Sequence, residues 1–287
     1  MGADLTSSDE KEPLSSKVPQ IVLVFWIIKL LTTGMGEALS DFLMGISFAV
    51  SGASRRMRGA GSMPSGNRTI MVITLALMVV VLIAFIITTM RIQLKSRCYV
   101  PWKYWLNVTA VAVVFTAAAD FTRPLGLIAS TALFLVIMAV IFIAWYRSEK
   151  TLSIHSITTR RRELFYWASV MATFAMGTAL GDLTAQTMKL GNLVSGFLFI
   201  GLIAVPAIAY KVFHVNEIFC FWFAYILTRP LGASFSDWMS DGIRMGGLGW
   251  GKGPVSLGLG IIIIVFVAYQ QIKYDKKKLI GAEYAGA

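Results

Sequence analysis

The feature that most constrains this chain is a spacing that occurs four times. An aromatic residue and a tryptophan open an apolar segment, and an aspartate follows fifteen residues after the tryptophan. The four sets are Phe25-Trp26 with Asp41, Tyr104-Trp105 with Asp120, Tyr166-Trp167 with Asp182, and Phe221-Trp222 with Asp237. On a helix that rises about 1.5 Å per residue, the spacing separates the two groups by about 22 Å. Because tryptophan favours the membrane interface, we expect each helix to have an aromatic anchor at one end and a carboxylate near the other. Four copies of one unit are predicted.

Composition places these segments in a membrane. Of the 287 residues, 56% are hydrophobic and only 14% are charged, whereas soluble domains have about 25% charged residues. A bilayer core needs about 20 apolar residues per helix. The candidate spans are residues 19–43, 70–90, 102–121, 125–146, 164–187, 193–211, 214–238 and 254–272. The sequence therefore predicts an all-α polytopic membrane protein without room for a soluble catalytic domain.

Acidic residues at membrane depth occur only in the odd-numbered spans. A charge at the bilayer centre costs at least about 2.5–3.5 kcal/mol, so we expect odd spans inside and even spans facing lipid. The predicted arrangement is four helix hairpins in the same orientation. Its segments are a disordered cytoplasmic tail at 1–18, repeats at 19–90, 101–147, 163–212 and 213–273, and a basic cytoplasmic tail at 274–287.

The net charge of +11 would suggest nucleic acid in a soluble protein, but in a membrane protein it sets topology. Of the 26 lysines and arginines, Lys29 and Arg229 lie inside spans. With the N-terminus inside, sixteen of the others fall on the cytoplasmic side and eight outside, which favours two cytoplasmic termini. The arginine-rich loop after the first span argues for the opposite orientation.

Two motifs carry a resemblance. They are Gly-Thr-Ala-Leu-Gly-Asp at 177–182 and Thr-Arg-Pro-Leu-Gly-Ala-Ser at 228–234. Together with four two-helix repeats that each contain a tryptophan, they resemble a bacterial membrane-protein family built from a tandem repeat of unknown function. The resemblance covers about residues 20–272. It implies a bacterial inner-membrane protein and brings no assigned chemistry.

The four aspartates are the first candidate site. On four interior helices, Asp41, Asp120, Asp182 and Asp237 are expected to form a ring of carboxylates. Like charges that close cannot all ionise without a counter-ion, so the ring would bind a cation or share protons. The alternative is that each aspartate caps a hairpin or pairs with a basic residue, Arg123 or Arg229, at the outer interface.

Glycine stands five residues before the aspartate in three units, at Gly36, Gly177 and Gly232, and the second unit has Phe115 there. Small residues let membrane helices approach closely. We therefore expect the inner helices to touch at these glycines.

Glu37 and Asp41 are the candidate metal ligands. At positions i and i+4 they share one helix face, and oxygen ligands suit hard divalent ions such as Mg²⁺, Ca²⁺ or Mn²⁺. Only the first unit has an acid four residues before its aspartate; the third has Thr178, which we include in the predicted ion-binding set. The alternative is that Glu37 pairs with a basic residue from another span.

Three basic residues are the expected counter-charges, namely Lys29, Arg123 and Arg229. A lone membrane lysine such as Lys29 neutralises buried acids or acts as a Schiff-base or proton-coupling group. Arg229 precedes Pro230, where the helix is expected to break and free backbone carbonyls for a site. The pentapeptide Thr-Arg-Pro-Leu-Gly occurs at 122–126 and 228–232, but after the aspartate in one unit and before it in the other.

No phosphate-binding loop, Gly-x-Ser-x-Gly elbow or His-Glu-x-x-His motif is present, so no enzyme is predicted. The sequence favours a transporter or channel for a cation, with a divalent metal as a candidate substrate and coupling protons as another possibility. The alternative is a non-transporting anchor or sensor that binds a partner through its basic loops. Predicted partners are the lipid bilayer and a small ion or small-molecule substrate, with a homo-oligomer allowed and nucleic acid not expected. No cofactor is expected.

Overall fold

The computed structural model describes residues 16–50 and 65–285, and this part of the chain is helical, without strands. Its long helices are α1 (Leu23–Val50), α3 (Ser65–Lys95), α4 (Pro101–Phe121), α5 (Leu127–Glu149), α6 (Arg160–Asp182), α7 (Gly191–Phe213), α8 (Glu217–Ser240) and α9 (Lys252–Ala285). Within the described residues all eight contain a segment long and apolar enough to cross a bilayer. The predicted all-α polytopic membrane fold is confirmed.

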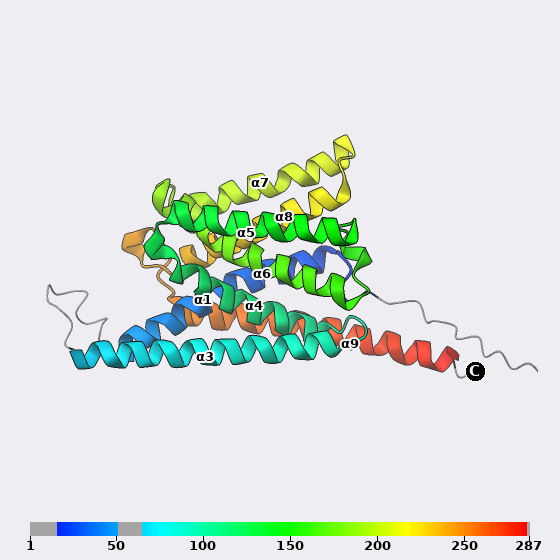
Figure 1. The fold of residues 1–287 in the computed structure, drawn as a ribbon, viewed down its shortest axis with the longest axis horizontal. Helices are drawn as coiled ribbons and strands as arrows, with labels where there is room; N and C mark the ends of the chain where they lie inside the picture. The colour runs from blue at the N-terminus through cyan, green and yellow to red at the C-terminus, as the bar shows by residue number, and fades with distance from the viewer. Residues whose placement is uncertain (1–15, 51–64, 286–287) are drawn as a thin grey trace, which may run out of the picture.

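The eight long helices run roughly along one direction (Figure 1), and their burial divides them into four inner and four outer helices. More than half of the apolar part of α1, α4, α6 and α8 is buried inside the protein, against less than a quarter for α3, α5, α7 and α9. The acid-bearing spans are therefore inside and the charge-free spans outside, as predicted. The physical reason is that a carboxylate is far costlier against lipid than against the polar groups of neighbouring helices.

The inner helices form a closed ring in the order α1, α4, α6, α8 and back to α1. Each outer helix packs mainly against the inner helix of the next unit, so that α3 lies on α4, α5 on α6 and α7 on α8. The last outer helix, α9, packs against α1 and closes the ring, and Figure 1 shows the two side by side. The hairpins of the sequence are thus interlocked rather than separate packing units.

The repeated aromatic residues form a ring of their own at the end of the axis opposite the aspartates. The first aromatic residue of each unit packs on the tryptophan of a neighbouring unit. The ring centroids are 5.7 Å apart for Phe25 and Trp105, 5.5 Å for Tyr104 and Trp167, 6.2 Å for Tyr166 and Trp222, and 5.8 Å for Phe221 and Trp26. Three of the tryptophans are buried, so the expectation that they anchor the helices at the lipid interface is wrong for Trp105, Trp167 and Trp222. Packing between repeats outweighs the interfacial preference of the indole rings.

The three repeated glycines close the inner ring. A β-carbon at Gly36 would lie 2.5 Å from a side chain of α4, one at Gly177 would lie 2.5 Å from a side chain of α8, and one at Gly232 would collide with α1. The facing residues are Ala112, Arg229 and Thr33, respectively. Each glycine therefore touches the residue that stands eight positions before the aspartate of the next unit.

The expected helix break at Pro230 is absent. Helix α8 runs without interruption from Glu217 to Ser240 with the proline inside it. The proline lies against α6, where the missing side chain of Gly177 leaves room for its ring: a β-carbon there would lie 3.0 Å from the proline Cδ, whereas one at Gly181 would be in ordinary contact at 3.7 Å. Membrane helices tolerate an internal proline where neighbouring helices pack around it, so α8 continues through Pro230 instead of breaking.

The structure describes part of each predicted tail. Residues 1–15 lie outside the described residues, but Lys17 is nearly buried and forms an ion pair of 2.8 Å with Glu163. At the other end, α9 continues through the predicted basic tail to Ala285.

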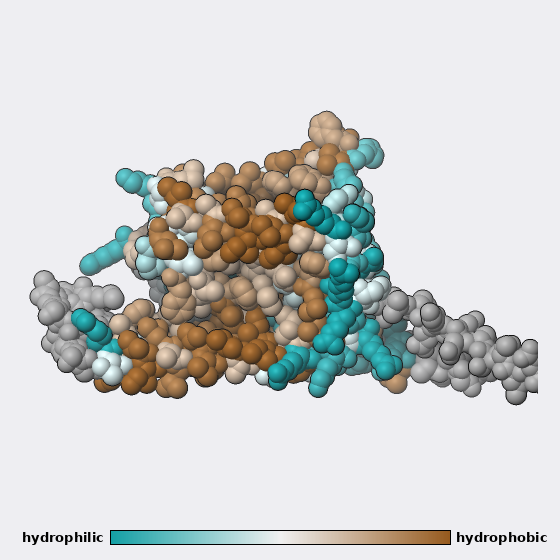
Figure 2. Space-filling view, in the orientation of Figure 1, coloured by the Kyte–Doolittle hydropathy of each residue, from teal (hydrophilic) through white to brown (hydrophobic). Residues whose placement is uncertain are grey.

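The surface has the pattern of a membrane protein. In Figure 2 an apolar belt covers the outer helices, and hydrophilic residues gather at the ends, most densely at the end that carries the basic loops. We call this the basic-loop end and the opposite end the mouth end. A multi-pass membrane protein is therefore supported, whereas the side of the membrane on which each end lies stays a prediction.

Candidate functional site

The four repeated aspartates lie together at the mouth end of the inner ring. Asp120 and Asp182 stand at the last turns of α4 and α6, and Asp237 stands three residues before the end of α8. Their side chains are 7–16% exposed, and that of Asp41 is 27% exposed. We call these four carboxylates the mouth ring, which lies at the edge of the protein interior rather than deep within it.

One lysine bridges half of the mouth ring. The ammonium of Lys252, the first residue of α9, lies 2.8 Å from Asp41, 2.5 Å from Asp237 and 3.3 Å from Asp241. It is 23% exposed, and a hollow of about 330 Å³ lined by α1 reaches both Lys252 and Asp41. Lys252 was not among the predicted site residues. It follows a glycine-rich loop, and basic residues in loops were expected to set topology rather than to pair with buried acids.

The same loop explains how Lys252 reaches the mouth ring. The loop folds back on α8, where the backbone N–H groups of Leu248, Trp250 and Gly251 donate to the last carbonyls of the helix at 2.8–3.1 Å. Its glycines at 246, 249 and 251 all have positive φ, a conformation that a side chain would strain. The glycine run therefore serves to tie the start of α9 to the end of α8.

Arg123 bridges the other half. Its guanidinium lies 3.1 Å from Asp120 and 2.6 Å from Asp182. A 3₁₀ turn, Arg123–Leu125, follows α4 and presents this side chain to the next inner helix. The expected pairing of aspartates with Arg123 is what the structure shows at these two positions.

One turn deeper, Arg229 connects all four inner helices. Its guanidinium donates to Glu37 at 2.6 Å, to the Thr33 carbonyl at 2.6 Å and to Thr178 at 2.8 Å, and also to Thr116. Glu37, Thr116 and Thr178 are the residues four positions before the aspartates of their units. We call this group the Arg229 node; arginine and carboxylate are each 1% exposed.

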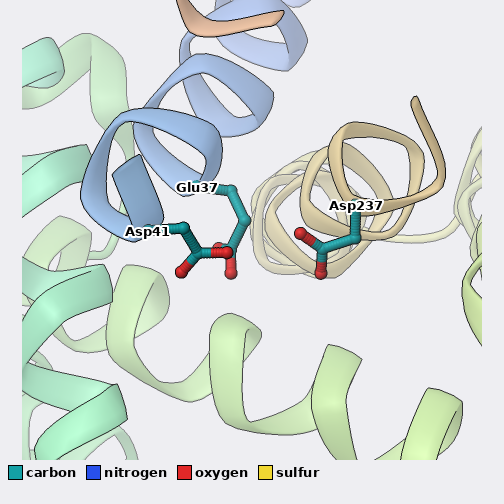
Figure 3. A group of neighbouring side chains, drawn as sticks. All are labelled: Glu37, Asp41 and Asp237. Carbon is teal, nitrogen blue, oxygen red and sulfur yellow. The ribbon is translucent and has the colours of Figure 1, made fainter. Parts of the chain in front are cut away.

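Among the residues that the structure describes, one group of acids could hold a divalent ion. Carboxylate oxygens of Glu37, Asp41 and Asp237 lie within 4.8 Å of one another, and Figure 3 shows the three side chains facing a common space between α1 and α8. All three already have a basic partner, Arg229 for Glu37 and Lys252 for the two aspartates. The donors fit a hard ion, and such an ion would have to displace the Lys252 ammonium.

Lys29 lies deeper still, apart from the acids. It is 1% exposed, and its Nζ lies 4.0 Å from the ring centroids of Phe174 and Tyr225. No ion pair involves it within the described residues. The predicted site residues thus fall into three groups along the axis: the mouth ring with Arg123, the Arg229 node with Glu37 and Thr178, and Lys29.

The basic-loop end of the axis is closed by aromatic and buried polar groups. The hydroxyls of Tyr104 and Tyr166 share a hydrogen bond. Beyond them the fully buried Glu163 pairs with Lys17 and accepts a hydrogen bond from Gln93 at 3.1 Å. Sequence reasoning did not single out Glu163, whose place at the start of a helix after three arginines is typical of a solvated cap.

A ring of four interlocked helix pairs around a charged axis defines a polytopic membrane protein built by internal repetition. The chain belongs to the family described as Repeat of Unknown Function (DUF347), whose model matches residues 103–151, 165–215 and 220–273. These matches cover the second, third and fourth helix pairs, and the first pair has the same aromatic-to-aspartate spacing. The family resemblance is confirmed. No curated protein and no solved structure matches the chain.

Proposed function

We propose that the protein is a transporter that moves a cation through the acidic site at the mouth of the inner ring. The observation that supports this most is an excess of carboxylates at the mouth end and in the Arg229 node. The acids are Asp41, Asp120, Asp182, Asp237, Asp241 and Glu37, and the basic groups paired with them are Arg123, Arg229 and Lys252. Six acids against three bases attract cations when all are ionised, since a partly enclosed acidic cleft concentrates positive ions.

The exchangeable part of the site is the half held by Lys252. Its ammonium and its carboxylate partners are partly exposed, so an incoming ion can take its place without breaking into the protein interior. Arg229 is buried and hydrogen-bonded to the three other inner helices, and it stays. Hard divalent ions such as Mn²⁺ match an oxygen-only donor set.

Below the mouth ring the axis is closed, because the Arg229 node spans all four inner helices. A permanently open channel does not fit this arrangement. Transport would require the inner helices to rearrange and expose the site to the other side, as in transporters that work by alternating access.

The test is Mn²⁺ uptake into proteoliposomes. Asp41→Asn and Asp237→Asn are expected to abolish uptake because they remove ligands without changing side-chain size. Asp275→Asn is the matched control, since Asp275 is an exposed carboxylate on α9 that hydrogen-bonds only Gln271. Normal uptake by a folded Asp41→Asn variant would contradict the proposal.

The closed axis also favours a second function, that of an anchor or sensor. Arg160, Arg161 and Lys150 are exposed at the basic-loop end, where a partner with an acidic surface would bind. If the protein is an anchor or sensor, vesicles that contain the wild type take up no more Mn²⁺ than empty vesicles. Replacing these three residues by glutamine then abolishes binding of the partner, whereas Asp41→Asn leaves partner binding unchanged.

A further inference from the structure

Lys29 is the buried charged group whose presence the acidic site does not explain. Its side chain points between α6 and α8, where Phe174 and Tyr225 each place a ring 4.0 Å from Nζ. The acid that stands two turns further along the same helix, Glu37, is already bonded to Arg229 at 2.6 Å. Between the mouth ring and the Glu163–Lys17 pair at the basic-loop end, the described interior therefore has two basic side chains, Lys29 and Arg229, and one acid, Glu37.

Opposing influences act on the Lys29 proton. The two aromatic faces stabilise an ammonium, whereas exclusion of water and the positive charge of Arg229 disfavour it. Arg229 lies near the same ring as Lys29, with Cζ 5.4 Å from the Phe174 ring centroid. A small change in charge on the axis is enough to decide whether Nζ keeps its proton.

The other neighbours do not supply a compensating charge. Helix α6 presents Phe174 and, further along, Tyr166, while α8 presents Tyr225 and Arg229. Helix α4 presents Tyr104 at the level below. The two outer helices packed on α1, α3 and α9, have charged residues only toward their ends.

We propose that Lys29 is the proton-coupling residue of the transporter, and this rests on the proposed function. A cation bound between Glu37, Asp41 and Asp237 adds positive charge above Arg229 and expels the proton from Nζ. The amine keeps its electron pair and becomes neutral, and the proton passes to water. When the cation leaves, Nζ takes up a proton again, so cation and proton are exchanged in opposite directions.

The tyrosines mark the side to which the proton leaves. Tyr225 contacts the lysine, and the hydrogen-bonded hydroxyls of Tyr104 and Tyr166 lie between this level and the basic-loop end. Hydroxyl groups both donate and accept hydrogen bonds, so they can pass a proton toward the basic-loop end. In the opposite direction, toward the mouth ring, the positive charge of Arg229 repels the proton.

The experiment counts protons released when Mn²⁺ binds to the purified full chain, by calorimetry in buffers of different ionisation enthalpy between pH 6 and 8. The wild type is expected to release about one proton per ion, and its Mn²⁺ affinity is expected to rise with pH. Lys29→Gln is expected to bind Mn²⁺ with little proton release and a flat pH profile. Lys29→Arg, which keeps its charge, is expected to bind more weakly at every pH.

The outcomes separate the two proposals. If the wild type does not bind Mn²⁺, the proposed function fails. If it binds without releasing a proton, or if Lys29→Gln releases as many protons as the wild type, the Lys29 assignment alone is overturned, and in the latter case the protons come from the mouth ring. Should the Lys29 variants fail to fold, the wild-type proton count still decides against the assignment if it is zero.

Discussion

The mouth ring and the Arg229 node combine the same two chemical groups, carboxylates and basic side chains, in different settings. At the mouth, Lys252 and Arg123 come from segments that follow inner helices, and the exposed fractions of the two basic side chains are 23% and 43%. In the node, arginine and glutamate are buried and each belongs to an inner helix. Exposure lets the mouth pairs exchange partners with ions from solution, whereas the node acts as a fixed link between the four repeats.

The largest effect is expected where a buried charge loses its partner. Arg229→Met leaves Glu37 unpaired and is predicted to lower the free energy of unfolding by about 3–5 kcal/mol. Unfolding in mixed micelles, followed by tryptophan fluorescence, measures this. Adding Glu37→Met should restore part of the loss; if Arg229→Met alone is as stable as the wild type, the node does not hold the repeats together.

A second buried carboxylate tests whether burial, rather than position, makes the difference. Glu163→Gln removes the charge that pairs with Lys17 and is expected to cost about 1.5–3 kcal/mol in the same assay. Its matched control is Glu217→Gln, an exposed acid at the start of α8. Equal effects of the two substitutions would show that burial is not the deciding factor.

The third prediction concerns the glycine that lets α6 approach the node. Gly177→Ala places a methyl group against Arg229 and is predicted to destabilise by about 1–3 kcal/mol. Gly181→Ala, one turn away on the same helix, meets its nearest neighbour at 3.7 Å, so it should be neutral or gain up to about 1 kcal/mol from helix propensity. The measurement is the difference between the melting temperatures of Gly177→Ala and Gly181→Ala. A lower melting temperature for Gly181→Ala than for Gly177→Ala would mean that α6 and α8 can move apart easily at Gly177.

The smallest change in stability is expected at the mouth. Lys252→Gln should alter the free energy of unfolding by about 1 kcal/mol or less, as partly exposed ion pairs do. The same substitution is expected to tighten Mn²⁺ binding, because it removes the competing ammonium. Titration calorimetry on this variant and on Arg123→Gln, which leaves the Lys252 half of the mouth ring intact, measures the two Mn²⁺ affinities. Weaker Mn²⁺ binding by Lys252→Gln would contradict the proposal that the ion takes the place of the Lys252 ammonium.

Much of the fold could be predicted because membrane physics acts on each span separately. Acidic residues at membrane depth occur only in the odd-numbered spans, and this pattern predicted which helices are inside. The glycines five residues before the aspartates predicted where helices touch. The break at Pro230 was predicted wrongly, since the tolerance of a helix for proline depends on a neighbour, here Gly177 of α6. The buried tryptophans show the same limitation, because their partners lie in other repeats.

The candidate site was predictable in part. The mouth ring follows from the repeat, but its division between Lys252 and Arg123 depends on loop geometry that no periodicity encodes. The two Thr-Arg-Pro-Leu-Gly segments are alike in sequence, yet one arginine stands three residues after an aspartate and the other eight before. This offset moves Arg229 from the mouth into the interior, and only the assembled ring shows what it meets there.

The closure of the ring by α9 has a consequence for biosynthesis. Glu37 enters the membrane early, but its partner in the node is made 192 residues later, and α9, which covers α1, follows the other seven long helices of the described chain. Until then the first span carries two acids and a lysine without their final neighbours. We therefore expect this span to be sheltered from lipid, at the insertion machinery or beside the helices made after it, until α9 closes the ring.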